Sequence, residues 1–208
     1  MQKPRVVLGE VAIHEAGHFV VGHHFGVSLR YSATIVREGD SLGEVMGDGG
    51  DWDNQEEAFA RIAELLGGYR AQMRVAPLGR CLRGADHDLD MARRILRCAF
   101  AEDSRLTTFF KARRETDAIL TSGWERVLGL AGLLLEHGSI DAETAEMWLD
   151  YASGAEGVDE VAVSRYFALR AVAGGEDLDR ESVPPPEDVA VRWKHYVDIG
   201  RSVAPDVQ

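Results

Sequence analysis

Two histidines and a glutamate lie within five residues near the start of the chain, in the segment HEAGH that begins at His14. The segment matches HExxH, and on an α-helix the side chains of His14 and His18 project from the same face, one turn apart. Two imidazoles at this spacing can bind one Zn²⁺ ion, and Glu15 lies close to such an ion without being required to bind it. A carboxylate in that place is suited to accept a proton from the attacking water. The motif therefore predicts metal-assisted hydrolysis with Glu15 as the general base.

A catalytic zinc site needs a third protein ligand, and the nearest candidate along the chain is His24. The longer motif HExxHxxGxxH places a histidine there, but it requires a glycine where this chain has Val21. A β-branched residue favours a continued helix, which would turn His24 about 80° away from His14. We therefore expect His24 to be a solvated residue at the end of the helix.

The elements that would position these side chains are mainly helical. Apolar residues recur at helical spacing between capping or stop signals over residues 8–25, 54–66, 86–102, 118–138, 141–152, 158–175 and 189–200. Alternating apolar and polar residues over 27–35 predict a half-buried strand, and residues 41–46 predict a returning strand. The predicted fold class is mainly α (α+β), with a small β-hairpin or sheet after the HExxH helix.

Single residues mark the ends and the contacts of these helices. Asn54 and Asp141 are typical N-caps, and Asp86 is expected to cap the helix that it begins. Gly67 and Gly68 each cost a helix about 1 kcal/mol relative to alanine, so we expect close packing at this pair.

Composition excludes several classes of function. The 208 residues include 23 Lys and Arg against 35 Asp and Glu, a net charge of −12 that would repel a phosphate backbone or an anionic membrane surface. No apolar stretch reaches the ~20 residues needed to cross a bilayer, and the N-terminal segment lacks the apolar region of a secretory signal. Two cysteines, Cys81 and Cys98, are too few for a disulfide framework. We therefore expect a cytoplasmic protein with no nucleic-acid partner and no membrane anchor.

The order of motifs along the chain resembles the FtsH-type zinc peptidases, the protease domains of the ATP-dependent membrane proteases of bacteria and organelles. After HEAGH, the segment REGDSLGEVM is similar to the PRG-x-x-LG strand pair of that family, and ELLGGYRAQMR is similar to its LGGRAAEE helix. GADHDLDMARRIL resembles the element GASNDL-x-x-AT, and AILTSGWERVLGLAGLLLEHGSID resembles the helices that close the family domain. The resemblance covers roughly residues 10–150, and the ordered series is far more specific than HExxH alone.

The resemblance implies a set of site residues. It implies a zinc ion bound by His14, His18 and Asp88, with Glu15 as the general base. In the resembled family the substrate lies along an edge strand, for which the candidate substrate-binding residues here are Leu42, Gly43, Glu44 and Val45. A plain structural hairpin is the alternative for these four residues.

The chain departs from the family pattern at three positions near the implied site. The paired glutamates that follow LGGRAA are Gln72 and Met73 here, and the asparagine before the ligand aspartate is His87. These changes bear on substrate preference and on the support of the ligands, and they leave the implied ligands and base in place.

Two regions are expected: an FtsH-like zinc peptidase domain over residues 1–152, and a helical C-terminal extension over 153–208 that packs on it. No G-x-x-x-x-G-K-[ST] phosphate loop occurs in the chain, so the implied function is ATP-independent hydrolysis of peptide bonds in peptides or unfolded proteins by a zinc endopeptidase. A homo-oligomer and a separate ATPase are left open as partners. Two other functions stay open: a catalytically idle zinc-binding module with a regulatory or protein-binding role, and a helical interaction protein with solvated histidines.

Overall fold

The structure is a computed structural model, and it describes residues 8–27, 33–35, 44–45, 52–76, 81, 85–173 and 188–204. These residues are mainly helical, as the sequence predicts. The helices are α1 (Leu8–His24), α2 (Gln55–Gln72), α4 (Asp86–Ala99), α5 (Glu102–Ser122), α6 (Trp124–His137), α7 (Ala142–Ser153), α8 (Glu160–Ala173) and α9 (Val189–Val203).

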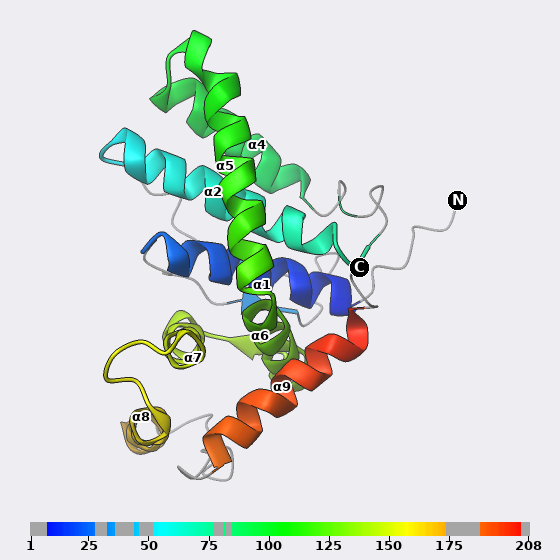
Figure 1. The fold of residues 1–208 in the computed structure, drawn as a ribbon, viewed down its shortest axis with the longest axis vertical. Helices are drawn as coiled ribbons and strands as arrows, with labels where there is room; N and C mark the ends of the chain where they lie inside the picture. Colours follow the sequence, from blue (N-terminus) through cyan, green and yellow to red (C-terminus); the bar gives the residue numbers. More distant parts are fainter. Residues whose placement is uncertain are drawn as a thin grey trace.

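Helix α1 lies in the middle of the molecule (Figure 1). It contacts α2, α5, α6, α7 and α9, and all of its residues from Gly9 to Gly22 are buried. A helix that is buried on every side cannot expose its polar residues to water, so each polar group on it needs a partner inside the protein. The HExxH residues lie on this helix, and the neighbouring helices must supply those partners.

The bounds of α4, α5 and α6 differ from those predicted from the sequence. The helical block predicted over 118–138 contains the end of α5 and all of α6, because the chain turns at Gly123 and the two helices are bent by 77°. The predicted helix over 86–102 ends earlier, at Ala99, and α5 begins at Glu102. Helix α5 contacts both α2 and α4, so these three helices form one side of the molecule.

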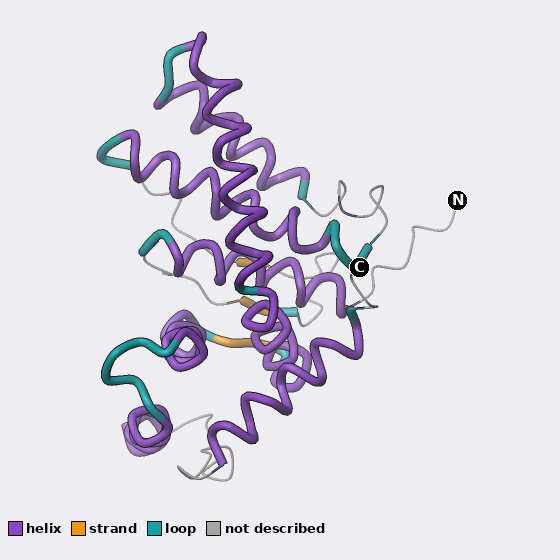
Figure 2. Tube along the Cα trace, viewed as in Figure 1, coloured by secondary structure: helices purple, strands orange, loops and turns teal. Residues whose placement is uncertain are grey.

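Among the described residues, short strands lie between the helices (Figure 2). They are β1 (Ala33–Thr34), β2 (Glu44–Val45) and β3 (Ser139–Ile140), and they pair in the order β2-β1-β3. Both pairings are antiparallel: Ala33 lies opposite Val45 on one side and opposite Ile140 on the other. Strand β1 falls within the predicted strand over 27–35, of which residues 28–32 lie outside the described residues.

Two of the three predicted caps are present. The Asn54 side chain accepts hydrogen bonds from the backbone N–H groups of Glu56 and Glu57, and the Asp141 side chain accepts one from Thr144. The prediction for Asp86 is wrong: the N-cap of α4 is Ala85, which makes no side-chain capping bond. Asp86 is instead the first helical residue, where the helix dipole favours a negative charge.

Helix α9 packs closely on α6. A Cβ atom on Gly132 of α6 would overlap the backbone carbonyl of Tyr196, and one on Gly200 of α9 would overlap the backbone carbonyl of Leu128. The indole rings of Trp148 and Trp193 stack beside this contact with their centroids 5.6 Å apart. Glycines on both helices therefore allow the two backbones to approach, and aromatic side chains fill the space around them.

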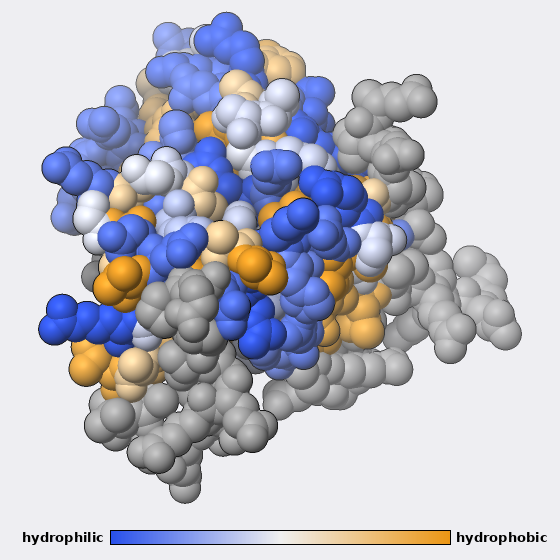
Figure 3. Space-filling model, turned by 60° about the horizontal axis from the view of Figure 1, so that its bottom comes forward, coloured by the Kyte–Doolittle hydropathy of each residue, from blue (hydrophilic) through white to orange (hydrophobic). Residues whose placement is uncertain are grey.

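Hydrophilic residues cover most of the face shown in Figure 3, and hydrophobic residues form separate patches among them. In the part of the chain that the structure describes, no single helix has both the length and the apolar character needed to cross a membrane. Helices α5 and α6 reach that threshold only when taken together as a bent pair.

Candidate functional site

Three potential metal ligands from two helices converge beside α2. His14 and His18 come from α1 and Asp88 comes from the first turn of α4. The Nε2 atoms of the two histidines lie 3.1 Å apart, and Asp88 Oδ2 lies 3.0 Å from His14 Nε2 and 3.4 Å from His18 Nε2. One donor atom from each residue falls within 4.8 Å of the others, so this group could hold one metal ion.

Both histidines are buried, with exposed fractions of 7% for His14 and 5% for His18. The alternative of two solvated histidines on a surface helix is therefore wrong. The physical reason is the position of α1, which is enclosed by other helices on all sides from Gly9 to Gly22.

Hydrogen bonds to acceptors on α2 place a proton on Nδ1 in both histidine rings. His14 Nδ1 donates to the Gln72 side-chain Oε1 at 3.2 Å, and His18 Nδ1 donates to the backbone carbonyl of Glu64 at 2.9 Å. Because Nδ1 carries a proton in each ring, Nε2 is the atom left to bind a metal. Gln72, which departs from the family pattern, thus orients His14 through an uncharged amide.

Gly68 of α2 makes the space in which the two rings meet. A Cβ atom at this position would overlap Nε2 of His18 and would lie 2.7 Å from Nε2 of His14. Any larger residue would therefore enter the space between the two potential ligands. The close packing expected at Gly67 and Gly68 is present, and for Gly68 the neighbours are the histidines themselves.

Glu15 lies in the same buried environment, with 5% of its surface exposed. Burial raises the pKa of the Glu15 carboxyl, and the nearby His14 and His18 offset part of that effect. A carboxyl with a raised pKa is better matched to taking up and returning a proton than an ordinary surface glutamate.

His18 and Asp88 shift each other's pKa in opposite directions. Burial would lower the pKa of His18, but the Asp88 and Glu64 carboxylates outweigh it and hold that pKa well above its usual value. Burial would likewise raise the pKa of Asp88, but His18 and His14 outweigh it and hold that pKa well below its usual range. Each of these two groups thus stabilises the charged form of the other.

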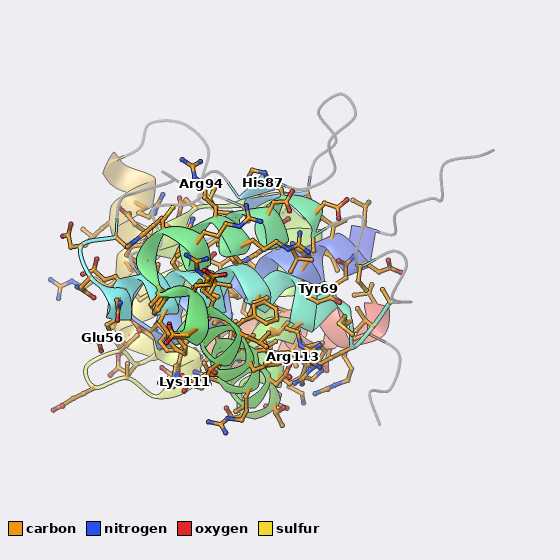
Figure 4. The ribbon with its side chains drawn as sticks, turned by 90° about the horizontal axis from the view of Figure 1, so that it is seen from above. Glu56, Tyr69, His87, Arg94, Lys111 and Arg113 are labelled. Atoms are coloured by element: carbon orange, nitrogen blue, oxygen red, sulfur yellow. The ribbon has the colours of Figure 1, made fainter. Side chains whose placement is uncertain are left out.

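Other potential donor groups near these residues in sequence lie away from the group of His14, His18 and Asp88. His24 is exposed at the end of α1, as expected from Val21. His87 is exposed and lies with Arg94 on the outer side of α4 (Figure 4). Asp90 is exposed and pairs with Arg93, with Asp90 Oδ1 2.7 Å from the guanidinium.

The candidate substrate-binding residues are described only in part. Glu44 and Val45 form β2, which pairs with β1 and, among the described residues, lies at one edge of the sheet. Leu42 and Gly43 lie outside the described residues.

A buried partner of the site, Glu64, was not expected from the sequence. The Glu64 carboxylate, with 2% of its surface exposed, lies 3.4 Å from His18 Nδ1 and accepts a hydrogen bond from Arg61 at 2.8 Å. The available signal was a lone acidic residue in the apolar run from Ile62 to Leu66, since an acid is rarely buried unless it is paired.

No protein-family model matches the chain, and no curated protein is significantly similar to it.

Proposed function

We propose that this chain is a zinc-dependent endopeptidase that hydrolyses peptide bonds in peptides or unfolded proteins without ATP. The observation that carries the proposal is the convergence of His14, His18 and Asp88 within 4.8 Å, with Glu15 beside them on α1. The fold proposed is the helical zinc-peptidase fold of the FtsH type, which the order of sequence motifs supports.

The chemistry of the donor atoms fits zinc. Two neutral imidazole nitrogens and one carboxylate oxygen are a typical protein ligand set for catalytic zinc, which keeps one further position open. Gly68 leaves the space between the two rings free of side-chain atoms, and Gln72 and Glu64 hold the rings in the metal-binding tautomer. A zinc ion bound there would supply Lewis acidity, which makes water a stronger nucleophile and polarises the scissile carbonyl.

Glu15 supplies the proton transfers. Its carboxylate accepts the proton of the attacking water and then delivers that proton to the leaving amine. Burial suits it to both steps, because the raised pKa favours uptake of the proton and the low exposure keeps bulk water from taking it away. Asp88 serves as a ligand, and its lowered pKa keeps its oxygen available to a cation.

The proposed substrate is an extended peptide segment. An edge strand offers unpaired backbone groups that bind an extended chain with little sequence selectivity, and β2 lies at an edge of the sheet formed by the described residues. Leu42, Gly43, Glu44 and Val45 are the residues proposed to contact it. A peptide or unfolded protein is therefore the proposed partner, with a homo-oligomer or a separate ATPase left open and a cytoplasmic location still a prediction.

The low exposure of the ligands favours a second candidate function, a zinc-holding module without turnover. Structural zinc sites are closed to solvent, and His14 and His18 are both almost fully buried. The retained Glu15 supports the peptidase instead, because a closed structural site has no use for a buried base.

One experiment separates these functions. The purified chain is assayed for bound metal and for hydrolysis of unfolded, fluorescently labelled casein, before chelation, after chelation and after zinc is added back. We expect one zinc per chain and hydrolysis that disappears and returns with the metal. Zinc without hydrolysis would establish the idle module, and a chain that binds no zinc would refute both functions.

A further inference from the structure

We propose that Glu64 is a positioning residue for His18 and that its carboxylate, shared between His18 and Arg61, sets the affinity of the His14, His18 and Asp88 group for zinc. This inference rests on the proposed function as far as metal binding is concerned, and it does not depend on peptidase turnover. It assigns a role to an acidic side chain outside the expected ligand set.

The first step is the cost of burying Glu64. Its neighbours in the apolar run are Ile62, Leu65 and Leu66, all buried in the hydrophobic core, and a leucine or alanine would suit the same helix. A carboxylate taken out of water costs several kcal/mol unless it gains partners inside the protein. The partners that Glu64 gains are His18 and Arg61.

The second step is what the carboxylate does to His18. The Nδ1–H group of His18 lies 2.9 Å from the Glu64 carbonyl oxygen and 3.4 Å from the Glu64 Oε1 atom. The Glu64 carbonyl oxygen keeps the proton of His18 on Nδ1. The negative charge of the Glu64 carboxylate, on the Nδ1 side of the ring, makes Nε2 a stronger electron-pair donor to a metal cation. The two histidines therefore differ in this respect, because Nδ1 of His14 donates to the uncharged Gln72 amide.

The third step is the opposing effect of Arg61. Its guanidinium lies one turn earlier on α2 and donates to Glu64 Oε2 at 2.8 Å, so it competes with His18 for the carboxylate charge. If Arg61 is removed, the negative charge of the Glu64 carboxylate acts on His18 without competition from the guanidinium. If Glu64 is neutralised, His18 loses the effect of that charge. The two partners of one ion pair thus have opposite expected effects on zinc affinity.

The test uses the full chain and two ions as probes. Zinc affinity is measured by competition with a chelator of known affinity, and Co²⁺ is added to the metal-free protein so that its visible absorption reports the ligand field. Glu64→Gln keeps the size of the side chain and removes its charge. We expect it to bind zinc about 10- to 100-fold more weakly than the unchanged chain and to shift the Co²⁺ spectrum.

Two matched variants complete the design. Arg61→Gln is expected to bind zinc no more weakly than the unchanged chain, because the Glu64 carboxylate is retained. Glu56→Gln makes the same chemical change at an exposed position in the first turn of α2 (Figure 4) and should alter neither readout.

Each outcome has a defined meaning. If Glu64→Gln binds zinc with unchanged affinity and an unchanged Co²⁺ spectrum, the positioning role is refuted while the metal site stands. If Glu64→Gln and Arg61→Gln weaken zinc binding to the same extent, the ion pair acts only as structural support and the inference is also refuted. If the unchanged chain binds no zinc, the proposed function itself fails.

Discussion

Gly17 of α1 and Gly67 of α2 meet backbone to backbone. A Cβ atom on Gly17 would lie 2.5 Å from the Gly67 carbonyl oxygen, and one on Gly67 would lie 2.6 Å from the Gly17 carbonyl oxygen. Contacts this short leave no room for a side chain on either residue, so the crossing of the two helices depends on both glycines. The same crossing places His18 within hydrogen-bonding distance of Glu64, because both lie close to these glycines in sequence.

The crossing predicts a loss of stability in Gly67→Ala. Alanine favours an isolated helix by about 1 kcal/mol, but its methyl group would press on the Gly17 backbone, which cannot rotate away. We expect a net loss of about 1–3 kcal/mol in the free energy of unfolding. Chemical denaturation followed by circular dichroism measures it, and Glu56→Ala, at an exposed position of the same helix, is the control. A Gly67→Ala variant as stable as the unchanged chain would contradict the close crossing.

Gly68→Ala is expected to act on metal binding. The added methyl group would overlap Nε2 of His18 and lie 2.7 Å from Nε2 of His14, so both rings would have to turn away from the metal position. Because ligand geometry controls affinity, we expect zinc to bind at least about 10-fold more weakly. Isothermal titration with zinc measures this, and circular dichroism should show that the helices persist. Unchanged zinc affinity in a folded Gly68→Ala protein would rule out this position for the metal.

The proposed base gives a separate prediction. Because Glu15 is expected to carry protons and not to bind the metal, Glu15→Gln should keep one zinc per chain and lose on the order of 10²-fold or more in turnover. Bound metal and casein hydrolysis are measured on the same preparation, with Glu56→Gln as the control. Hydrolysis at the original rate by Glu15→Gln would show that another group transfers the proton.

A further prediction concerns the use of energy. The 208-residue chain contains no phosphate-binding loop of the type G-x-x-x-x-G-K-[ST], so hydrolysis of an unstructured peptide should not respond to ATP. A stably folded substrate should resist cleavage for the same reason, since nothing in this chain would unfold it. Rates with and without ATP and Mg²⁺ are compared for both substrates. An increase caused by ATP in the purified chain would contradict the proposed function as stated.

The sequence predicts those parts of the fold that depend on local signals. The bounds of α1 follow from its apolar residues and from Gly26, and the caps Asn54 and Asp141 follow from residue type. The first half of α5, before Ala112, carries no such signal. The buried positions of α5 in the described structure are Ala112, Thr116, Ile119 and Leu120, so few apolar residues mark its inner face before Ala112.

The residues of the candidate site also differ in how far they can be predicted from local sequence signals. His14 and His18 are predictable because two residues four apart on a helix must share a face. Asp88 is 74 residues from His14 and enters the prediction only through the resemblance to a family. The lone acid in an apolar run marks Glu64 as a buried residue that needs a partner, but its contact with His18 is not predictable, because it depends on how α1 and α2 cross and that crossing is set by packing between distant segments.

The identity of the third ligand is the last prediction, and it separates the proposed site from one completed by His24. Asp88 Oδ2 is 3.0 Å from His14 Nε2, whereas His24 and His87 are exposed and take no part in this group. We therefore expect Asp88→Ala to weaken zinc binding by about 10- to 100-fold or more, and His24→Ala and His87→Ala to leave it nearly unchanged. Zinc titrations of the three variants under one buffer condition measure this directly. Loss of zinc in His24→Ala together with its retention in Asp88→Ala would overturn both the ligand set and the resemblance to the FtsH-type peptidases, because the metal would then be held at the end of α1, away from α4.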